Sequence, residues 1–169
     1  MGYFMHNELT AIDIKKMKDE IAYRQEFITP KCKEEVQRTR ALGDLSENDE
    51  YRSAKRELNR NYSRIRYLKA MIETAVVIEV KSSPDEVCLF DKVTIYYEDD
   101  DEERVITLVT TLRNDVLKDL ISKESPLGKA LLGRKVGDRV KIVVNDQISY
   151  YVIIRAIEKG HDDESLEIN

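Results

Sequence analysis

The feature that most restricts the fold of this chain is a long stretch with almost no helix-breaking residues. Between Leu9 and Ala75 there is one proline, Pro30, and one glycine, Gly43. Lys, Glu, Arg, Leu and Ala fill most of the positions between them, and these residue types favour the α-helix. The stretch therefore predicts two long helices separated near Gly43.

Apolar residues after Gly43 recur at alternating steps of three and four, which is the seam pattern of a coiled coil. The seam positions are Tyr51, Ala54, Leu58, Asn61, Ile65, Leu68, Ile72 and Ala75. Asn61 is the one strongly polar member, and such a residue commonly fixes helix register at some loss of stability. A less regular stripe before Gly43 would supply the partner face: Ile14, Met17, Ile21, Ile28, Val36 and Leu42.

The connection between the two helices is short, which forces them to run antiparallel. Gly43 suits the position after a helix end, where φ is often positive, and Ser46 followed by Asp49 resembles a capping box. Pro30 removes one backbone donor, so we expect a mild kink there. With about 30 residues in each helix, the hairpin would project roughly 45 Å at 1.5 Å per residue.

The second half of the chain changes to short runs rich in Val, Ile, Thr and Tyr, which predict strands. The expected strands are 76–80, 93–97, 105–109, 140–144 and 149–154, with turns at 98–103 and 145–147 and short helices at 115–120 and 126–132. The predicted fold class is α+β. An antiparallel helical hairpin at 1–75, with its tip at 43–50, precedes a β-rich domain at 76–158 and a polar, frayed tail at 159–169.

Charge is distributed unevenly along the 169 residues, whose net charge is −5. Between Lys31 and Arg66 there are 10 basic and 7 acidic residues, so this segment is net positive. A basic surface within an acidic protein indicates a specific anionic partner rather than general affinity for DNA.

The remaining composition excludes several classes of protein. Cys32 and Cys88 are far apart, and without a CxxC pattern or a Cys/His cluster they argue against a structural zinc site. No apolar run approaches the roughly 20 residues that span a bilayer, and the first residues lack the apolar core of a signal peptide. We therefore expect a cytoplasmic protein with reduced thiols and no membrane partner.

The segment joining the two helices is unusually acidic. Asp44, Glu47, Asp49 and Glu50 lie within seven residues. Carboxylates three residues apart on a turn can share a hard cation such as Mg²⁺, for which one or two carboxylates suffice when a partner supplies the remaining ligands. The alternative is that these side chains serve only solubility.

Basic residues border the acidic segment. Arg40 precedes it, and Arg52, Lys55 and Arg56 follow it. A stripe at steps of four continues through Arg52, Arg56, Arg60 and Arg64. Such a stripe is either solvated helix surface, paired with Glu57 and its neighbours, or a track for a single nucleic-acid strand toward the tip.

The tip segment GDLSENDEY at 43–51, followed by Ala54-Lys55, closely resembles the tip of the Gre factors, especially the GreA type. A second resemblance lies in Ile121-Ser122, Ser125-Pro126-Leu127-Gly128, Ala130-Leu131-Leu132-Gly133 and Val136-Gly137-Asp138. The resemblance covers nearly the whole chain, in the right order and spacing. The resemblance implies a C-terminal FKBP-like domain that docks on bacterial RNA polymerase. It also implies a coiled coil that enters the secondary channel, where it stimulates cleavage of backtracked RNA.

The same resemblance implies roles for particular residues. Asp44 and Glu47 would be the catalytic acids associated with an Mg²⁺ shared with the polymerase, and Asn48 and Tyr51 would shape the tip. The nascent RNA 3′ end would face the basic patch of Arg40, Arg52, Lys55 and Arg56. Docking would use Ser125, Pro126, Leu127, Gly128 and Leu131. The chain would act as a monomer and would not itself be an enzyme.

Two departures from the Gre pattern keep a second hypothesis open. Asp49 stands where the family usually has alanine, and the segment 109–115 lacks the Gly and Glu-x-Asp pattern typical there. The chain could instead be a divergent paralogue that occupies the channel and modulates or inhibits polymerase without cleavage. Prolyl isomerase activity is a further alternative, against which the absence of tryptophan argues. A purely structural coiled-coil adaptor would leave the acidic tip unexplained.

Overall fold

The computed structural model describes residues 7–43 and 48–169, which form two compact units. One unit is Ile14–Ala75. The other contains Val76–Asn169 together with the described residues up to Asp13. We predicted a boundary at 75/76 with the N-terminal residues in the hairpin. These residues group with the second unit because strand β1 (Asn7–Leu9) pairs with β2 (Ala75–Val77) and Asp13 contacts Arg113.

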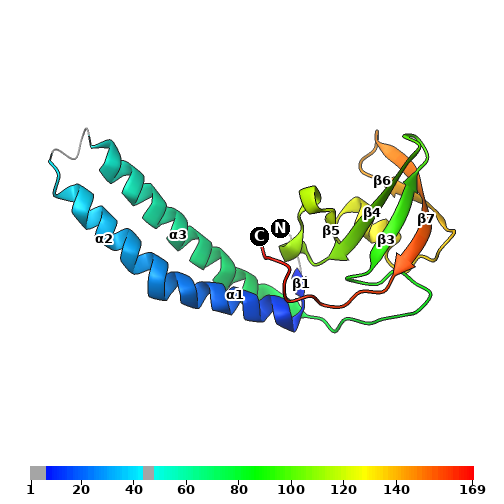
Figure 1. Ribbon diagram of the computed structural model, residues 1–169, viewed down its shortest axis with the longest axis horizontal. Coiled ribbons are helices and arrows are strands. Elements are labelled where there is room, and N and C mark those ends of the chain that lie inside the picture. The colour runs from blue at the N-terminus through cyan, green and yellow to red at the C-terminus, as the bar shows by residue number, and fades with distance from the viewer. Residues whose placement is uncertain (1–6, 44–47) are drawn as a thin grey trace. The chain divides into compact units, whose positions relative to one another are not determined.

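The first unit is an antiparallel helical hairpin (Figure 1). Its first arm consists of α1 (Ala11–Tyr23), a π-helical turn at Arg24–Ile28 and α2 (Thr29–Arg40). Its second arm is α3 (Asp49–Thr74), whose 26 residues span about 39 Å at 1.5 Å per residue. The two arms are joined by contacts at Glu20–Arg64, Thr29–Asn61 and Thr39–Asn48. Residue numbers rise along the first arm while those of the partners fall along α3, which confirms the antiparallel arrangement.

The predicted seam of α3 is the face that packs against the first arm. Ala54, Asn61, Ile65 and Leu68 are buried, and the other four seam residues are half-buried. The partner stripe on the first arm is also confirmed, except for Leu42, whose side chain is 60% exposed. The prediction for Leu42 is wrong because α2 ends at Arg40, so Leu42 lies beyond the packed face.

The irregularity predicted at Pro30 takes the form of the π turn immediately before it. Proline has no amide hydrogen for the carbonyl four residues back. The Thr29 N–H bonds to the Arg24 carbonyl, five residues back, and so closes a wider turn. Helix therefore continues through the proline position.

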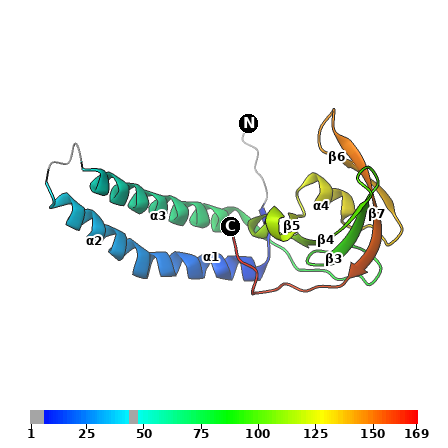
Figure 2. The same cartoon turned by 45° about the horizontal axis from the view of Figure 1, so that its top comes forward.

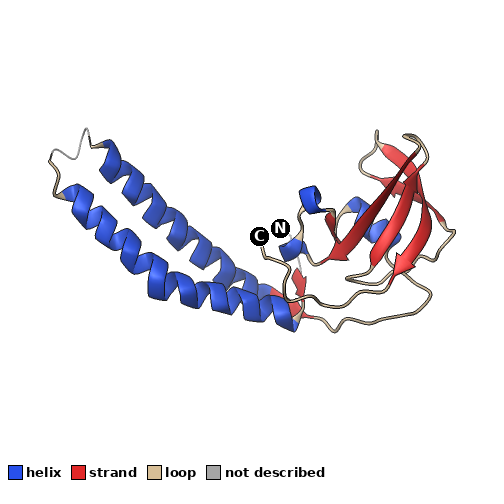
Figure 3. Ribbon diagram, in the orientation of Figure 1, coloured by secondary structure: helices blue, strands red, loops and turns tan. Residues whose placement is uncertain are grey.

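The second unit is built on a curled five-stranded sheet with the strand order β5-β4-β3-β7-β6 (Figure 3). The strands are β3 (Lys92–Tyr97), β4 (Glu102–Val109), β5 (Leu120–Ser122), β6 (Arg139–Val143) and β7 (Ser149–Glu158). Only β4 and β5 run parallel within this sheet. Both predicted hairpins, β3–β4 and β6–β7, are present.

Helix α4 (Pro126–Leu131), which confirms the short helix predicted at 126–132, lies against the sheet (Figure 2). Leu127 and Leu131 join a core with the inward-facing residues of the strands, among them Val93, Ile95 and Ile142. Alternate residues of β6 are buried and exposed, as expected for a sheet with one covered face. The predicted fold class, a helical hairpin followed by a β-rich FKBP-like domain, is confirmed.

Two predicted elements are wrong in this unit. The strand expected at 76–80 is limited to β2, which ends at Val77. The helix expected at 115–120 is a 3₁₀ turn at Val116–Lys118 followed by β5. The turn cannot extend because Asp119 adopts a left-handed conformation, with φ of 55°, and Leu120 is then committed to pairing with β4.

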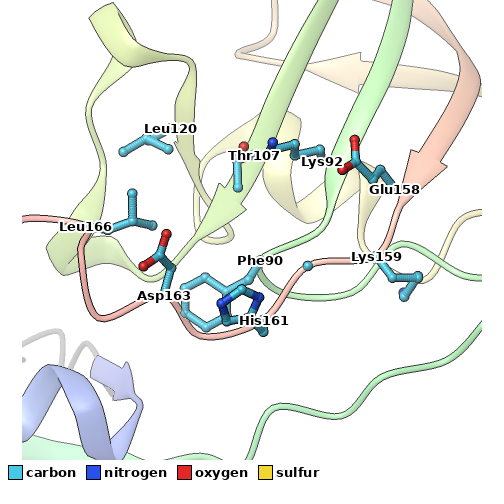
Figure 4. Close-up of a pocket in the computed structure, with 10 residues that line it drawn as sticks. Phe90, Lys92, Thr107, Leu120, Glu158, Lys159, His161, Asp163 and Leu166 are labelled. Carbon is cyan, nitrogen blue, oxygen red and sulfur yellow. The ribbon is translucent and has the colours of Figure 1, made fainter.

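The C-terminal residues 159–169 do not fray as predicted, because their polar groups find partners on the domain. Lys159 forms an ion pair with Asp91, and the Asn169 N–H donates to the Leu112 carbonyl. Leu166 packs beside Phe90. Figure 4 shows the pocket that Lys159, Leu166 and Phe90 line with neighbouring side chains of the domain. The tail is therefore a structural part of the domain.

Candidate functional site: the hairpin tip

The two acids that the sequence singled out, Asp44 and Glu47, lie outside the described residues. The residues on either side of them are described. Gly43 has a φ of 132°, which confirms the positive φ predicted after α2. Asn48 begins the return into α3.

Asn48 connects the two arms of the hairpin. Its Oδ1 accepts a 2.9 Å hydrogen bond from the Tyr51 N–H and so caps α3, while its Nδ2 donates a 2.8 Å bond to the Thr39 carbonyl at the end of α2. The sequence predicts a cap formed by Ser46 and Asp49. Ser46 lies outside the described residues, and the N-cap of α3 is Asn48. Asparagine is among the most favourable N-cap residues, so a single amide both caps α3 and bonds to the end of α2.

Asp49, the departure from the Gre pattern, occupies the first turn of α3. Its side chain is 92% exposed and lies 3.7 Å from the Arg52 guanidinium. An acid at this position interacts favourably with the helix dipole. Asp49 thus has a local role at the start of α3 and faces solvent.

Arg38 adds an ionic link between the arms near the tip. Its guanidinium lies 2.7 Å from Glu35 on its own helix and 3.4 Å from Glu50 on α3. The hydrogen bond from Arg38 holds the pKa of Glu35 below its ordinary value. Because these groups are exposed, the link contributes little to stability, but it keeps a cation at the base of the tip.

The predicted basic patch is gathered on α3. Arg52, Lys55 and Arg56 line a shallow, open depression together with Asp49 and Asn59. Lys55 also lies over the ring of Tyr51, with its Nζ 5.9 Å from the centroid. Arg40 is exposed at the last turn of α2 but does not line this depression.

The predicted arginine stripe divides into two parts. Arg60 pairs with Glu57 at 3.5 Å, and Arg64 binds both carboxylate oxygens of Glu20 at 2.9 and 3.0 Å. Arg64 therefore joins the two arms. Arg60 fits the interpretation of the stripe as helix surface whose charges are paired. Only the end of the stripe near the tip borders the depression.

Within residues 7–43 and 48–169, no group of three or more His, Cys, Asp or Glu side chains is arranged to hold a metal ion. The same residues include no helix that is both long and apolar enough to cross a membrane. Asp44 and Glu47 lie outside these residues.

The predicted docking motif at 125–131 mainly builds the domain. The Ser125 hydroxyl accepts from the Gly128 N–H and caps α4, while Leu127 and Leu131 are 9% and 0% exposed. A Cβ on Gly128 would lie 2.1 Å from the Ser122 carbonyl oxygen. Both leucines therefore pack in the core of the domain, whereas Pro126 is exposed, and docking through this motif stays a prediction.

The divergent segment at 109–115 contains a buried ionic cluster that the sequence did not reveal. The side chain of Arg113 is fully buried, and its guanidinium lies 2.6 Å from Asp13 and 2.6 Å from Asp162. It also donates to the Asp163 carbonyl and stacks over Phe90 at 4.9 Å. Arg113 of the divergent segment therefore has a structural role within the domain.

Comparison with known proteins agrees with this architecture. Residues 7–77 match the family described as "Transcription elongation factor, N-terminal", and residues 81–159 match "Transcription elongation factor, GreA/GreB, C-term". The chain belongs to the GreA/GreB family. The resemblance to Gre factors drawn from the two motifs is thereby confirmed.

Among the relatives of this GreA/GreB-family chain is the transcription elongation factor GreA of Thermotoga maritima. It is 38% identical over 151 residues, which cover 89% of this chain and 97% of the relative. GreA of Geobacillus kaustophilus is 42% identical over 143 residues, covering 82% and 90%. Both carry the GreA name, in agreement with the type that the tip sequence indicated.

Solved structures give a weaker likeness. Gfh1 of Thermus aquaticus matches with a TM-score of 0.42 and 22% identity over 91% of this chain and 99% of that one. A GreA/GreB factor from Nitrosomonas europaea matches with a TM-score of 0.39 and 27% identity over 56% and 79%.

Proposed function

We propose that this protein is a transcript cleavage factor that binds bacterial RNA polymerase and rescues backtracked elongation complexes. Its coiled coil would enter the secondary channel of the polymerase and bring Asp44 and Glu47 to the catalytic centre. The observation that carries the proposal is the construction of the tip. Asn48 ties the ends of both arms together on one side of the acidic segment, and Gly43 takes a positive φ on the other.

Two carboxylates are an incomplete ligand set for Mg²⁺, which prefers about six oxygen ligands. Asp44 and Glu47 would therefore hold the ion only beside the ligands of the polymerase and the RNA phosphate. The ion would supply charge stabilisation and activation of water for hydrolysis of the phosphodiester. The polymerase would carry the reaction, so the factor itself would not be an enzyme.

The basic depression of Arg52, Lys55 and Arg56 supports an RNA ligand. Its position on the turns of α3 next to the tip suits electrostatic contact with the extruded 3′ segment of the transcript. Arg40, exposed on the opposite arm, would add a further cation. We infer that these residues guide the RNA, while the acids act at the scissile phosphate.

The β-rich domain would dock on the rim of the channel through exposed side chains, among which Pro126 belongs to the predicted motif. The factor would act as a monomer in the cytoplasm, where its polymerase is. The remaining candidate function is occupancy of the channel without cleavage, which the exposed Asp49 at the start of α3 keeps in consideration.

The test is a cleavage assay on a purified, backtracked polymerase complex with wild-type protein, Asp44→Ala and Glu47→Ala. The wild type should shorten the transcript, and both variants should bind polymerase equally well but lose stimulation. Glu57→Ala serves as the matched control, because this exposed acid pairs with Arg60 and does not line the depression. Polymerase binding without cleavage by the wild type would favour the non-cleaving regulator.

A further inference from the structure

The first arm of the hairpin contains one residue more than a regular coiled-coil seam allows. Its inward-facing residues are Ile14, Met17, Ile21, Arg24, Ile28, Cys32, Val36 and Thr39, all buried or half-buried. A regular seam alternates steps of three and four, but here three consecutive steps of four occur between Arg24 and Val36. The π turn at Arg24–Ile28 lies where the extra residue must be absorbed.

Both ends of this π turn are held by a single side chain from the opposite arm. Asn61 is 3% exposed. Its Oδ1 accepts a 3.2 Å bond from Arg24, the first residue of the turn, and its Nδ2 donates a 2.8 Å bond to the hydroxyl of Thr29, directly after the turn. The amide therefore spans the extra residue.

A second pair of bonds joins the same region to α3. The Oε1 atom of Glu20 accepts hydrogen bonds from Arg24 at 2.7 Å and from Arg64 at 2.9 Å. The five side chains form one continuous network across the two arms: Thr29, Asn61, Arg24, Glu20 and Arg64. Such a network favours one arrangement, because an alternative would leave the buried amide of Asn61 unpaired.

We propose that Asn61 is a positioning residue that clamps the π turn and thereby sets the register of α2 against α3. The inference rests on the proposed function, because the register of the two arms matters only if it sets where the tip acids lie at the catalytic centre of the polymerase. If the π turn closed into an α turn, α2 would move by one residue, which is about 1.5 Å along its axis and about 100° around it. A misplacement of about 1 Å caused by a distant change can lower a rate about 100-fold.

The test compares Asn61→Leu with Asn61→Asp. Leucine removes both bonds from a seam position that it otherwise suits, whereas aspartate can accept from both Arg24 and the Thr29 hydroxyl. The register is read directly from the distance between spin labels at Gln37 and Ser53, both exposed, in a background with Cys32→Ser and Cys88→Ser. Cleavage stimulation, polymerase binding and melting temperature are measured on the same proteins.

We expect Asn61→Leu to melt no lower than the wild type, because a polar seam residue costs stability. It should nevertheless show a shifted or broadened label distance and at least a tenfold loss of cleavage stimulation, with polymerase binding retained. Asn61→Asp should behave as the wild type. Unchanged label distance in Asn61→Leu would overturn the clamp, and so would a loss of cleavage that only follows a loss of folded protein.

Thr29→Val gives an independent test, because it breaks the bond at one end of the turn and preserves side-chain shape. Its control is Thr74→Val, because the Thr74 hydroxyl bonds to the Ala70 carbonyl within its own helix, α3. Only the change at Thr29 should alter the label distance. If wild-type protein fails to stimulate cleavage, the proposed function is wrong, and the distances alone decide the clamp: a shift in Asn61→Leu supports it and no shift overturns it.

Discussion

Replacing Arg113 with methionine should strongly destabilise the β-rich domain. Arg113 and Asp13 both have fully buried side chains, and their charged atoms lie 2.6 Å apart. Removing one partner of a buried ion pair costs about 3–5 kcal/mol, because the other charge stays buried without compensation. Among the described residues, the carboxylate of Asp13 would then retain the bond from the Thr10 N–H.

The expected loss is large enough to measure by calorimetry on the full chain. For a domain of roughly 60–100 residues, about 1 kcal/mol shifts the melting temperature by about 4–8 °C. The transition of the β-rich domain should therefore fall by more than about 10 °C. The control is Arg104→Met, which removes an exposed arginine paired with Glu102 and should cost no more than about 1 kcal/mol.

A double variant separates the buried charge from the packing of Arg113. In the double variant Arg113→Met, Asp13→Asn, a neutral carboxamide replaces the buried carboxylate that lost its partner. Much of the lost stability should therefore return. The coupling between the two positions then follows from the double-mutant cycle. A shift no larger than that of Arg104→Met, or no recovery in the double variant, would refute the reasoning from buried charge.

Two further predictions concern the clamp region and the domain core. Burial alone would raise the pKa of Glu20, but hydrogen bonds from Arg64 and Arg24 hold it below its ordinary value of 4.5. This contribution to stability is complete above the ordinary pKa and is lost as pH falls through the lower, folded one. The hairpin should thus melt at lower temperature as pH drops below about 4.5, and Glu20→Gln should weaken that dependence whereas Glu26→Gln, at an exposed position, should not. Gly128→Ala would place a Cβ 2.1 Å from the Ser122 carbonyl oxygen. Calorimetry should show a severe loss of domain stability that Lys129→Ala does not reproduce, and normal stability in Gly128→Ala would contradict the close packing.

The features that the sequence predicted well are those governed by local periodicity. The α3 seam follows from steps of three and four that bury Ala54, Ile65 and Leu68. The β3–β4 and β6–β7 hairpins follow from strand-forming runs around polar turns. In each case neighbouring residues carry the information, and tertiary packing reinforces it.

The features that the sequence missed depend on partners distant in the chain. Arg113 bonds to Asp13, which is 100 positions away in the sequence, and no local pattern near either residue predicts this contact. The C-terminal tail is mostly polar, so its packing of Leu166 beside Phe90 could not be read from composition. Asn61 was recognised as a polar seam residue, but its partners Arg24 and Thr29 became evident only with the π turn.

At the tip, the sequence predicted the metal-associated acids, and the structure describes the residues on either side of them. Several residues near 46–49 are capable of capping a helix, so local sequence could not choose among them. The choice of Asn48 follows from its second bond, to the Thr39 carbonyl on the other arm. The roles of Asp44 and Glu47 remain predictions drawn from the sequence and the family.

The central claim is that Asp44 and Glu47 supply ligands for a metal ion shared with RNA polymerase. Its most direct test is the rate of transcript cleavage in a backtracked complex as a function of Mg²⁺ concentration, with wild-type factor and with each alanine variant saturating the polymerase. The account predicts that the wild type lowers the Mg²⁺ concentration needed for half-maximal cleavage and that either variant abolishes this effect. An unchanged Mg²⁺ dependence in the Asp44→Ala, Glu47→Ala double variant would contradict it.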